Sequence, residues 1–207
     1  MKQERTLSIE GKEYTLLISD EPQALLEAKA SGRAVLGCLD TGNGEGASRD
    51  FQGIPYVVPS MEYVTEELLE LILRRYLGLP WLIDETERLY IREFVKEDAE
   101  NIPEEEYGKE EEIFRDPDKL EVYIKNQYGF YEYGTWAVLK KSTSLLIGMA
   151  GVSNPNLPET ALQALPTLPD DLCWLELGYH IFKPYRKNGY ATEAAKAILS
   201  YSHEVLS

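Results

Sequence analysis

Residues 174–191 of this chain read WLELGYHIFKPYRKNGYA and form the most informative stretch of the sequence. Alternation of Leu175, Leu177, Tyr179 and Ile181 with the residues between them is typical of a β-strand. Small and apolar residues then recur at helical spacing, which predicts an amphipathic helix that includes Ala191, Ala194, Ala195, Ile198, Leu199, Ser202 and Val205. The stretch therefore predicts a strand, a short loop and a helix in direct succession.

The loop between the predicted strand and helix has features of an anion-binding site. The first backbone N–H groups of a helix lack intrahelical acceptors, and the helix dipole favours negative charge near them. Gly189 has no Cβ to keep a phosphate away from the backbone, and Arg186 and Lys187 add positive charge to an acidic protein. The pattern indicates a diphosphate site, with an ordinary strand–loop–helix connection as the alternative.

Residues 186–191, RKNGYA, also match a known motif. They resemble the (Q/R)-x-x-G-x-(G/A) acetyl-CoA loop of the GNAT superfamily of N-acetyltransferases. With the preceding strand and the following helix, residues 175–194 look like the branch that acetylates the N-termini of ribosomal proteins. The Leu89-Tyr90-Ile91-Arg92 strand fits the usual start of that branch, so the resemblance covers about residues 82–207.

The resemblance implies roles for individual residues. The main chain of His180, Ile181 and Phe182 would pair with the pantetheine arm of acetyl-CoA like an added strand. The pyrophosphate would bind the backbone amides of Arg186, Lys187, Asn188, Gly189, Tyr190 and Ala191. Acetyl transfer to an amine needs a neutral nucleophile and hence a general base. In several members a glutamate ten residues before the loop has that role, and Glu176 stands at this spacing; a salt-bridged Glu176 inside the sheet and His180 as the base are the alternatives.

One departure from the family pattern concerns the end of the chain. The family fold normally continues with a further strand, a helix and two more strands, whereas this sequence stops at Ser207. We therefore expect an α+β GNAT-like mixed sheet that is incomplete at the C-terminus, with an unpaired strand edge. A truncated product, a homodimer or a partner chain that completes the sheet would each account for this, and the proton donor to CoA has no candidate.

The first 80 residues predict a separate α/β module. Short apolar strands at 13–19, 34–39 and 56–58 alternate with helical patterns, one after the predicted N-cap Asp20 and one from Thr65. The stretch from Asp20 to Ser60 resembles the last part of a haloacid-dehalogenase-like hydrolase, without a DxDx(T/V) nucleophile motif. We expect a non-catalytic, Rossmann-like module over 1–80, and a GNAT-like domain over 82–207.

Residues 96–121 hold twelve acidic and four basic side chains. A solvated helical face explains this stretch, and a docking surface for a cationic substrate is the alternative. A second helical pattern covers 118–127. The stretches 135–140 and 145–152 predict adjacent antiparallel strands, and 153–171 has the composition of a loop.

The amino-acid composition argues against several further classes of function. The formal net charge of −15 repels phosphate backbones and argues against nucleic-acid binding. No apolar run is long enough to cross a bilayer, and the N-terminus has no secretory signal, so a cytoplasmic protein is expected. Cys38 and Cys173 lie outside any CxxC or Cys/His array, which argues against a disulfide framework or a metal site. The leading hypothesis is an acetyl-CoA-dependent N-acetyltransferase acting on an N-terminal α-amine or a small-molecule amine; the rival is a non-catalytic CoA-binding or interaction module.

Overall fold

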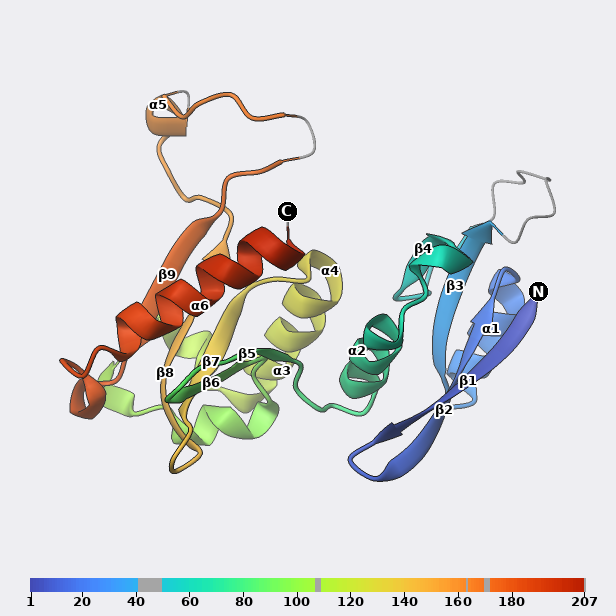
Figure 1. The fold of residues 1–207 in the computed structure, drawn as a ribbon, viewed down its shortest axis with the longest axis horizontal. Helices are drawn as coiled ribbons and strands as arrows, with labels where there is room; N and C mark the ends of the chain where they lie inside the picture. Colours follow the sequence, from blue (N-terminus) through green and yellow to red (C-terminus); the bar gives the residue numbers. More distant parts are fainter. Residues whose placement is uncertain (41–49, 107–108, 163, 170–171, 207) are drawn as a thin grey trace. The chain divides into compact units, whose positions relative to one another are not determined.

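The computed structural model describes residues 1–40, 50–106, 109–162, 164–169 and 172–206. It divides the chain into two compact units, Met1–Trp81 and Leu82–Ser207 (Figure 1). Each unit has its own sheet. The turn-forming residues that follow Asp40 in the sequence lie outside the described residues.

The N-terminal unit has a four-stranded sheet in the order β1-β2-β3-β4. Its strands and main helices are β1 (Lys2–Ile9), β2 (Lys12–Ser19), α1 (Pro22–Ala30), β3 (Ala34–Asp40), β4 (Val57–Ser60) and α2 (Glu66–Tyr76). Strands β2, β3 and β4 are parallel, whereas β1 pairs antiparallel with β2. The sequence analysis did not predict β1. Glu10 and Gly11 both have positive φ angles, of 50° and 79°, and such a pair forms the tight turn of a hairpin.

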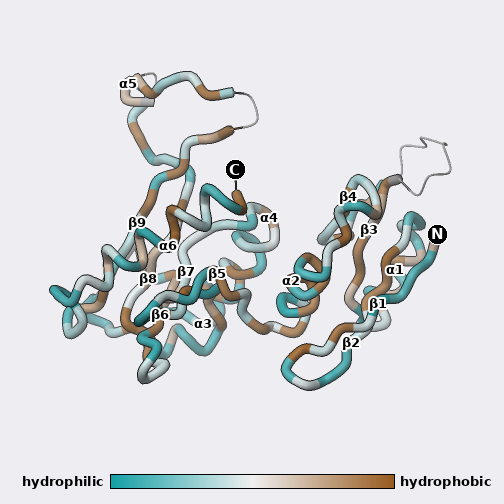
Figure 2. Tube along the Cα trace, in the orientation of Figure 1, coloured by the Kyte–Doolittle hydropathy of each residue, from teal (hydrophilic) through white to brown (hydrophobic). Residues whose placement is uncertain are grey.

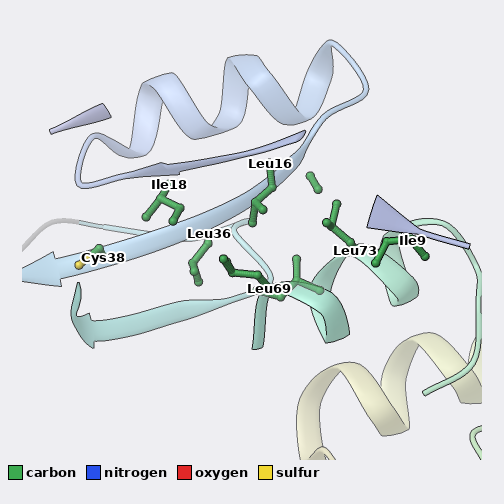
Figure 3. Close-up of a cluster of buried hydrophobic side chains, with 9 residues drawn as sticks. Ile9, Leu16, Ile18, Leu36, Cys38, Leu69 and Leu73 are labelled. Carbon is green, nitrogen blue, oxygen red and sulfur yellow. The ribbon is translucent and has the colours of Figure 1, made fainter. Parts of the chain in front are cut away.

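Apolar residues of this sheet face two helices on opposite sides. Leu16, Ile18 and Leu36 lie in one buried cluster with Leu69 and Leu73 of α2 (Figure 3). Leu17 and Val35 belong to another cluster with Leu25 and Ala28 of α1. The change of face between adjacent residues follows from strand alternation.

The prediction that Asp20 caps α1 is wrong. Glu21 is the N-cap residue, and its side chain makes no capping bond. The Asp20 carboxylate instead accepts a hydrogen bond from the amino group of Met1 at the start of the adjacent strand. Pro22 still begins the helix, where its missing N–H costs nothing.

The C-terminal unit has five strands in the order β5-β6-β7-β8-β9, all antiparallel. They are β5 (Leu82–Glu85), β6 (Leu89–Arg92), β7 (Thr135–Lys140), β8 (Leu145–Ser153) and β9 (Glu176–Ile181). The pairing of β7 with β8 confirms the two adjacent antiparallel strands predicted from the sequence. Strand β5 was not predicted. Within the described residues, β9 is an edge strand.

Helix α6 (Tyr190–Val205) covers one face of this sheet, and short helices between β6 and β7 cover the other (Figure 1). On the α6 side, the Trp136 ring packs edge-on against Tyr201 at 5.5 Å between centroids. On the other side, Ala137 and Met149 join a buried cluster with Phe94. The hydropathy-coloured trace shows α6 alternating polar and apolar positions along its length (Figure 2). Among the described residues, no helix combines the length and the apolar character that a membrane span requires.

The acidic stretch 96–121 differs from a uniform solvated helix. It forms the 3-10 helices η2 (Lys96–Asn101), η3 (Glu104–Glu106) and η4 (Lys109–Phe114) and then most of α3 (Pro117–Tyr123). The predicted helix over 118–127 continues as a π-helical segment, Ile124–Tyr128, and a short α4, Gly129–Tyr131. Two acidic side chains of the stretch point inward. Asp98 is 5% exposed and pairs with Arg92 at 2.7 Å, and Glu106 has a buried side chain.

Candidate active site

The loop that joins β9 to α6 has an unusual backbone. A short 3-10 helix, η6 (Lys183–Tyr185), follows the strand, and Gly189 is the N-cap residue of α6. Lys187 and Gly189 have φ angles of 64° and 81°, so both lie in the left-handed region. Gly189 adopts this conformation without a steric cost. A left-handed residue followed by the right-handed start of a helix turns successive N–H groups toward one side, which makes a concave anion site.

Hydrogen bonds on the protein side fix the carbonyl groups of this loop. The Asn188 side-chain amide donates to the carbonyl oxygens of Tyr185 at 3.1 Å and Arg186 at 3.0 Å. Arg88 donates to the Asn188 carbonyl at 3.0 Å. By contrast, the backbone N–H groups of residues 187–192 have no acceptor in the part of the chain that the structure describes. The loop therefore presents several donors that lack acceptors among the described residues.

A cavity of about 570 Å³ lies against these donors. Its lining residues are Tyr179, His180, Ile181, Tyr185, Arg186, Lys187, Gly189, Tyr190, Ala191 and Thr192. The structure thus brings together most of the cofactor-binding residues predicted from the sequence, whereas Phe182 and Asn188 do not line the cavity. Lys187 is exposed and makes no ion pair with any described residue, so its charge is available to an anion.

The side chains of Arg186 and His180 both contact the carboxylate of Glu106, a residue that the sequence analysis did not identify as part of the site. The Glu106 side chain is only 4% exposed. It lies 2.7 Å from the Arg186 guanidinium and 3.1 Å from His180 Nε2, and it accepts the Lys183 N–H at 2.6 Å. Burial alone would raise the pKa of Glu106, but the bonds from Lys183 and His180 and the charge of Arg186 outweigh burial and hold this pKa below its usual range.

Replacement of Glu106 with glutamine is expected to lower stability by about 1–3 kcal/mol at neutral pH, because Arg186, His180 and the Lys183 N–H lose a buried charged acceptor. A carboxylate with a lowered pKa stabilises the fold above its unfolded-state pKa, and this contribution is lost as the pH falls through the folded-state pKa. The difference between wild type and variant should therefore be largest near pH 7 and shrink below pH of about 4.3.

Urea denaturation at several pH values, followed by tryptophan fluorescence, measures this difference. The neighbouring Glu105 is exposed and provides the control, since Glu105→Gln should leave the free energy of unfolding unchanged. Equal unfolding free energies for Glu106→Gln and wild type at pH 7 would show that this carboxylate contributes nothing to the fold.

Strand β9 contributes residues to the cavity, and its outer edge has no strand partner among the described residues. The Phe182 N–H donates to Ile147 at 2.8 Å, so Phe182 faces β8. Because backbone groups alternate in direction along an antiparallel strand, His180 also faces β8, and Tyr179 and Ile181 face the open edge. Arg186 Nε donates to the outward carbonyl of Ile181 at 2.7 Å. Backbone pairing from this edge is thus available at Tyr179 and Ile181.

Glu176 begins β9, at the end of the strand remote from the loop. Ile181 is five positions further along the strand, which corresponds to about 17 Å in an extended chain. Its carboxylate is exposed and accepts the Asn156 N–H at 3.2 Å. Among the described residues Glu176 makes no ion pair, unlike the salt-bridged alternative considered from the sequence.

No group of three or more His, Cys, Asp or Glu side chains in the described ranges is arranged to hold a metal ion. Cys38 is buried and Cys173 is exposed, and neither forms a disulfide with a described residue.

Solved structures of acetyltransferases are similar to part of this chain. One from Agrobacterium tumefaciens is 21% identical over 59% of this chain and 67% of its own, with a TM-score of 0.38. A GNAT-family acetyltransferase from Bacillus anthracis is 20% identical over 59% of this chain and 66% of its own, with a TM-score of 0.39. The chain thus spans about two thirds of the length of these proteins. Curated proteins give no significant match.

A family model gives the stronger result. The acetyltransferase (GNAT) domain model matches residues 88–207, which is more than half of the chain. The matched region contains β7 to β9, the loop with its unpaired amides, and α6. The chain therefore belongs to the GNAT acetyltransferase domain family.

Proposed function

We propose that this protein transfers an acetyl group from acetyl-CoA to an amine. The observation that carries the proposal is the row of backbone N–H groups at residues 187–192, which lack acceptors among the described residues and border a cavity. A diphosphate needs several donors at close range, and a helix N-terminus with a concave loop supplies them together with a favourable dipole. Membership of the GNAT family supports acetyl-CoA as the ligand that brings this diphosphate.

In the proposed complex, the backbone of residues 187–191 binds the diphosphate, whereas the Arg186 N–H already donates to the Lys183 carbonyl at 3.4 Å. Lys187 adds a positive charge. The pantetheine arm lies along the outer edge of β9, beside the segment His180 to Phe182. Its amide groups pair with the outward backbone groups of Ile181 and Tyr179. The Arg186 side chain then leaves the Ile181 carbonyl, because both would use the same acceptor.

The proposed reaction is a direct transfer. The amine nitrogen attacks the acetyl carbonyl carbon, a C–N bond forms, the C–S bond breaks, and CoA leaves as a thiolate that takes up a proton. Glu176 receives the proton that the amine loses, since an exposed carboxylate without an ion-pair partner among the described residues can act as a general base. His180, whose Nε2 lies 3.1 Å from a Glu106 carboxylate oxygen, is the alternative base.

The proposed acceptor is a small-molecule amine or the N-terminal α-amine of a peptide. A carboxylate base and a net charge of −15 both favour the approach of a protonated, cationic amine over an anionic one. The use of acetyl-CoA would place this activity in the cytoplasm. A second copy or a partner chain paired along β9 is compatible with acetyl-CoA binding only where it leaves the edge at Ile181 accessible.

Calorimetry with acetyl-CoA and CoA tests the binding step, and release of free thiol in the presence of a panel of amines tests turnover. Binding with amine-dependent thiol release is the expected result. An absence of binding overturns the proposal. Binding without turnover for any amine or peptide in the panel would favour the non-catalytic CoA-binding module instead.

A further inference from the structure

The turn between β5 and β6 contacts the beginning of α6, more than one hundred residues later in the chain. Glu193, in the first turn of α6, receives hydrogen bonds at both carboxylate oxygens. Oε1 accepts the Thr86 hydroxyl at 2.6 Å and the Arg88 N–H at 2.9 Å. Oε2 accepts Arg88 Nε at 2.7 Å and lies 2.6 Å from another guanidinium nitrogen of the same side chain. Four donors from one turn thus hold a single carboxylate.

Arg88 also contacts the anion-binding loop itself. Its remaining guanidinium nitrogen donates to the Asn188 carbonyl at 3.0 Å, and its Cζ lies 4.7 Å from the centroid of the Tyr190 ring. One side chain therefore joins three positions of the loop and helix, namely Asn188, Tyr190 and Glu193. A planar guanidinium with five donors can make these contacts at once, which a lysine ammonium cannot.

The contacts between Arg88 and Glu193 affect the charge beside the anion-binding loop as well as its geometry. A carboxylate so close to the N-terminus of α6 would repel a bound diphosphate. Burial would raise the pKa of Glu193, but the bonds from Thr86 and Arg88 and the Arg88 charge outweigh it and keep the carboxyl ionised, with a lowered pKa. Arg88 thus neutralises this negative charge and also binds the Asn188 carbonyl.

We propose that Arg88 and Glu193 are positioning residues that hold the loop 186–191 in its anion-binding conformation. The inference rests on the proposed function, because it assigns these residues to the diphosphate part of the acetyl-CoA site. Lys187, a non-glycine residue in the left-handed region, makes the loop conformation unfavourable by itself, so external contacts are needed to maintain it. Arg88 supplies them directly, and Glu193 orients Arg88.

The test compares two ligands, CoA and pantetheine, of which only CoA carries the diphosphate. We expect Arg88→Met to weaken CoA binding on the order of 10- to 100-fold, as is usual when a residue that orients a binding group is removed. Glu193→Gln should have a smaller effect in the same direction, and Arg88→Lys an intermediate one. Pantetheine binding, measured by NMR titration, should change less than twofold in all three, since it uses the edge of β9.

Lys141→Met is the matched control. Lys141 lies beside the same turn, pairs with Glu85 and donates to the Thr86 carbonyl, but it has no contact with residues 186–193. This variant should bind both ligands like wild type. Circular dichroism and thermal unfolding of every variant check that the fold is retained.

The outcomes separate the inference from the proposed function. Wild-type CoA affinity in both Arg88→Met and Glu193→Gln overturns the inference while the proposed function stands. Equal loss of CoA and pantetheine binding also overturns it, because the pair would then support the fold in general. A wild-type protein that binds neither ligand overturns the proposed function, and the inference with it.

Discussion

Replacement of Gly189 with glutamate is expected to abolish acetyl-CoA binding. Gly189 has a φ of 81°, and a residue with a Cβ pays about 1–2 kcal/mol to remain there. An added Cβ would come no closer than 3.5 Å to Arg88, so the backbone angle is a greater obstacle than space. The new carboxylate would also lie beside the diphosphate donors, where repulsion of several kcal/mol corresponds to a loss of at least about 100-fold in affinity.

Isothermal titration calorimetry with acetyl-CoA measures this loss. Gly78→Glu is the matched control, because Gly78 has a φ of 72°, has open space where a Cβ would go, and belongs to the N-terminal unit. That variant introduces the same residue at the same kind of backbone angle. If Gly189→Glu retained the wild-type affinity, the loop would not be the diphosphate site.

Replacement of Glu176 with glutamine is expected to lower kcat by roughly 10²- to 10⁴-fold, the usual range for loss of a general base. The affinity for acetyl-CoA should stay close to that of wild type, since Glu176 stands at the far end of β9 from the loop. The change is nearly isosteric, and the amide oxygen can still accept the Asn156 N–H. A fall in kcat without a change in binding would therefore assign the residue to the proton transfer.

Steady-state kinetics with an amine that the wild-type protein acetylates measures both quantities. Glu132→Gln, which removes an exposed carboxylate at the end of α4, serves as the control and should keep wild-type rates. An unchanged kcat for Glu176→Gln would exclude Glu176 as the base and direct attention to other carboxylates or to water.

The elements predicted from the sequence are those with strong local patterns. Strand β9, its loop and α6 follow from alternation, Gly189 and a helical stripe, all within about thirty residues. Strand β8 is almost continuously apolar and was equally clear. Strand β1 was missed because its sequence, KQERTLSI, is mostly polar, and β5 because only two of its residues, in LIDE, are apolar. Both are edge strands, where one side of the backbone has no strand partner and polar residues are tolerated.

The residues that support the site could not be predicted in the same way. Glu106 belongs to a stretch in which nearly half of the side chains are acidic, so composition did not distinguish it from its solvated neighbours. Its role follows from contacts with His180 and Arg186, more than seventy residues away. Arg88 and Glu193 lie even farther apart in the chain. Such pairs depend on how the strands are ordered in the sheet, which periodicity in a single sequence does not determine.

The bond from Arg186 to the Ile181 carbonyl has a consequence for the protein without its ligand. The unpaired backbone groups of an edge strand can pair with strands of other molecules, and an edge that is left exposed favours aggregation. Here a charged side chain occupies an outward-facing acceptor of that edge, the Ile181 carbonyl. A strand of another molecule that paired at this position would have to displace Arg186, which disfavours self-association there.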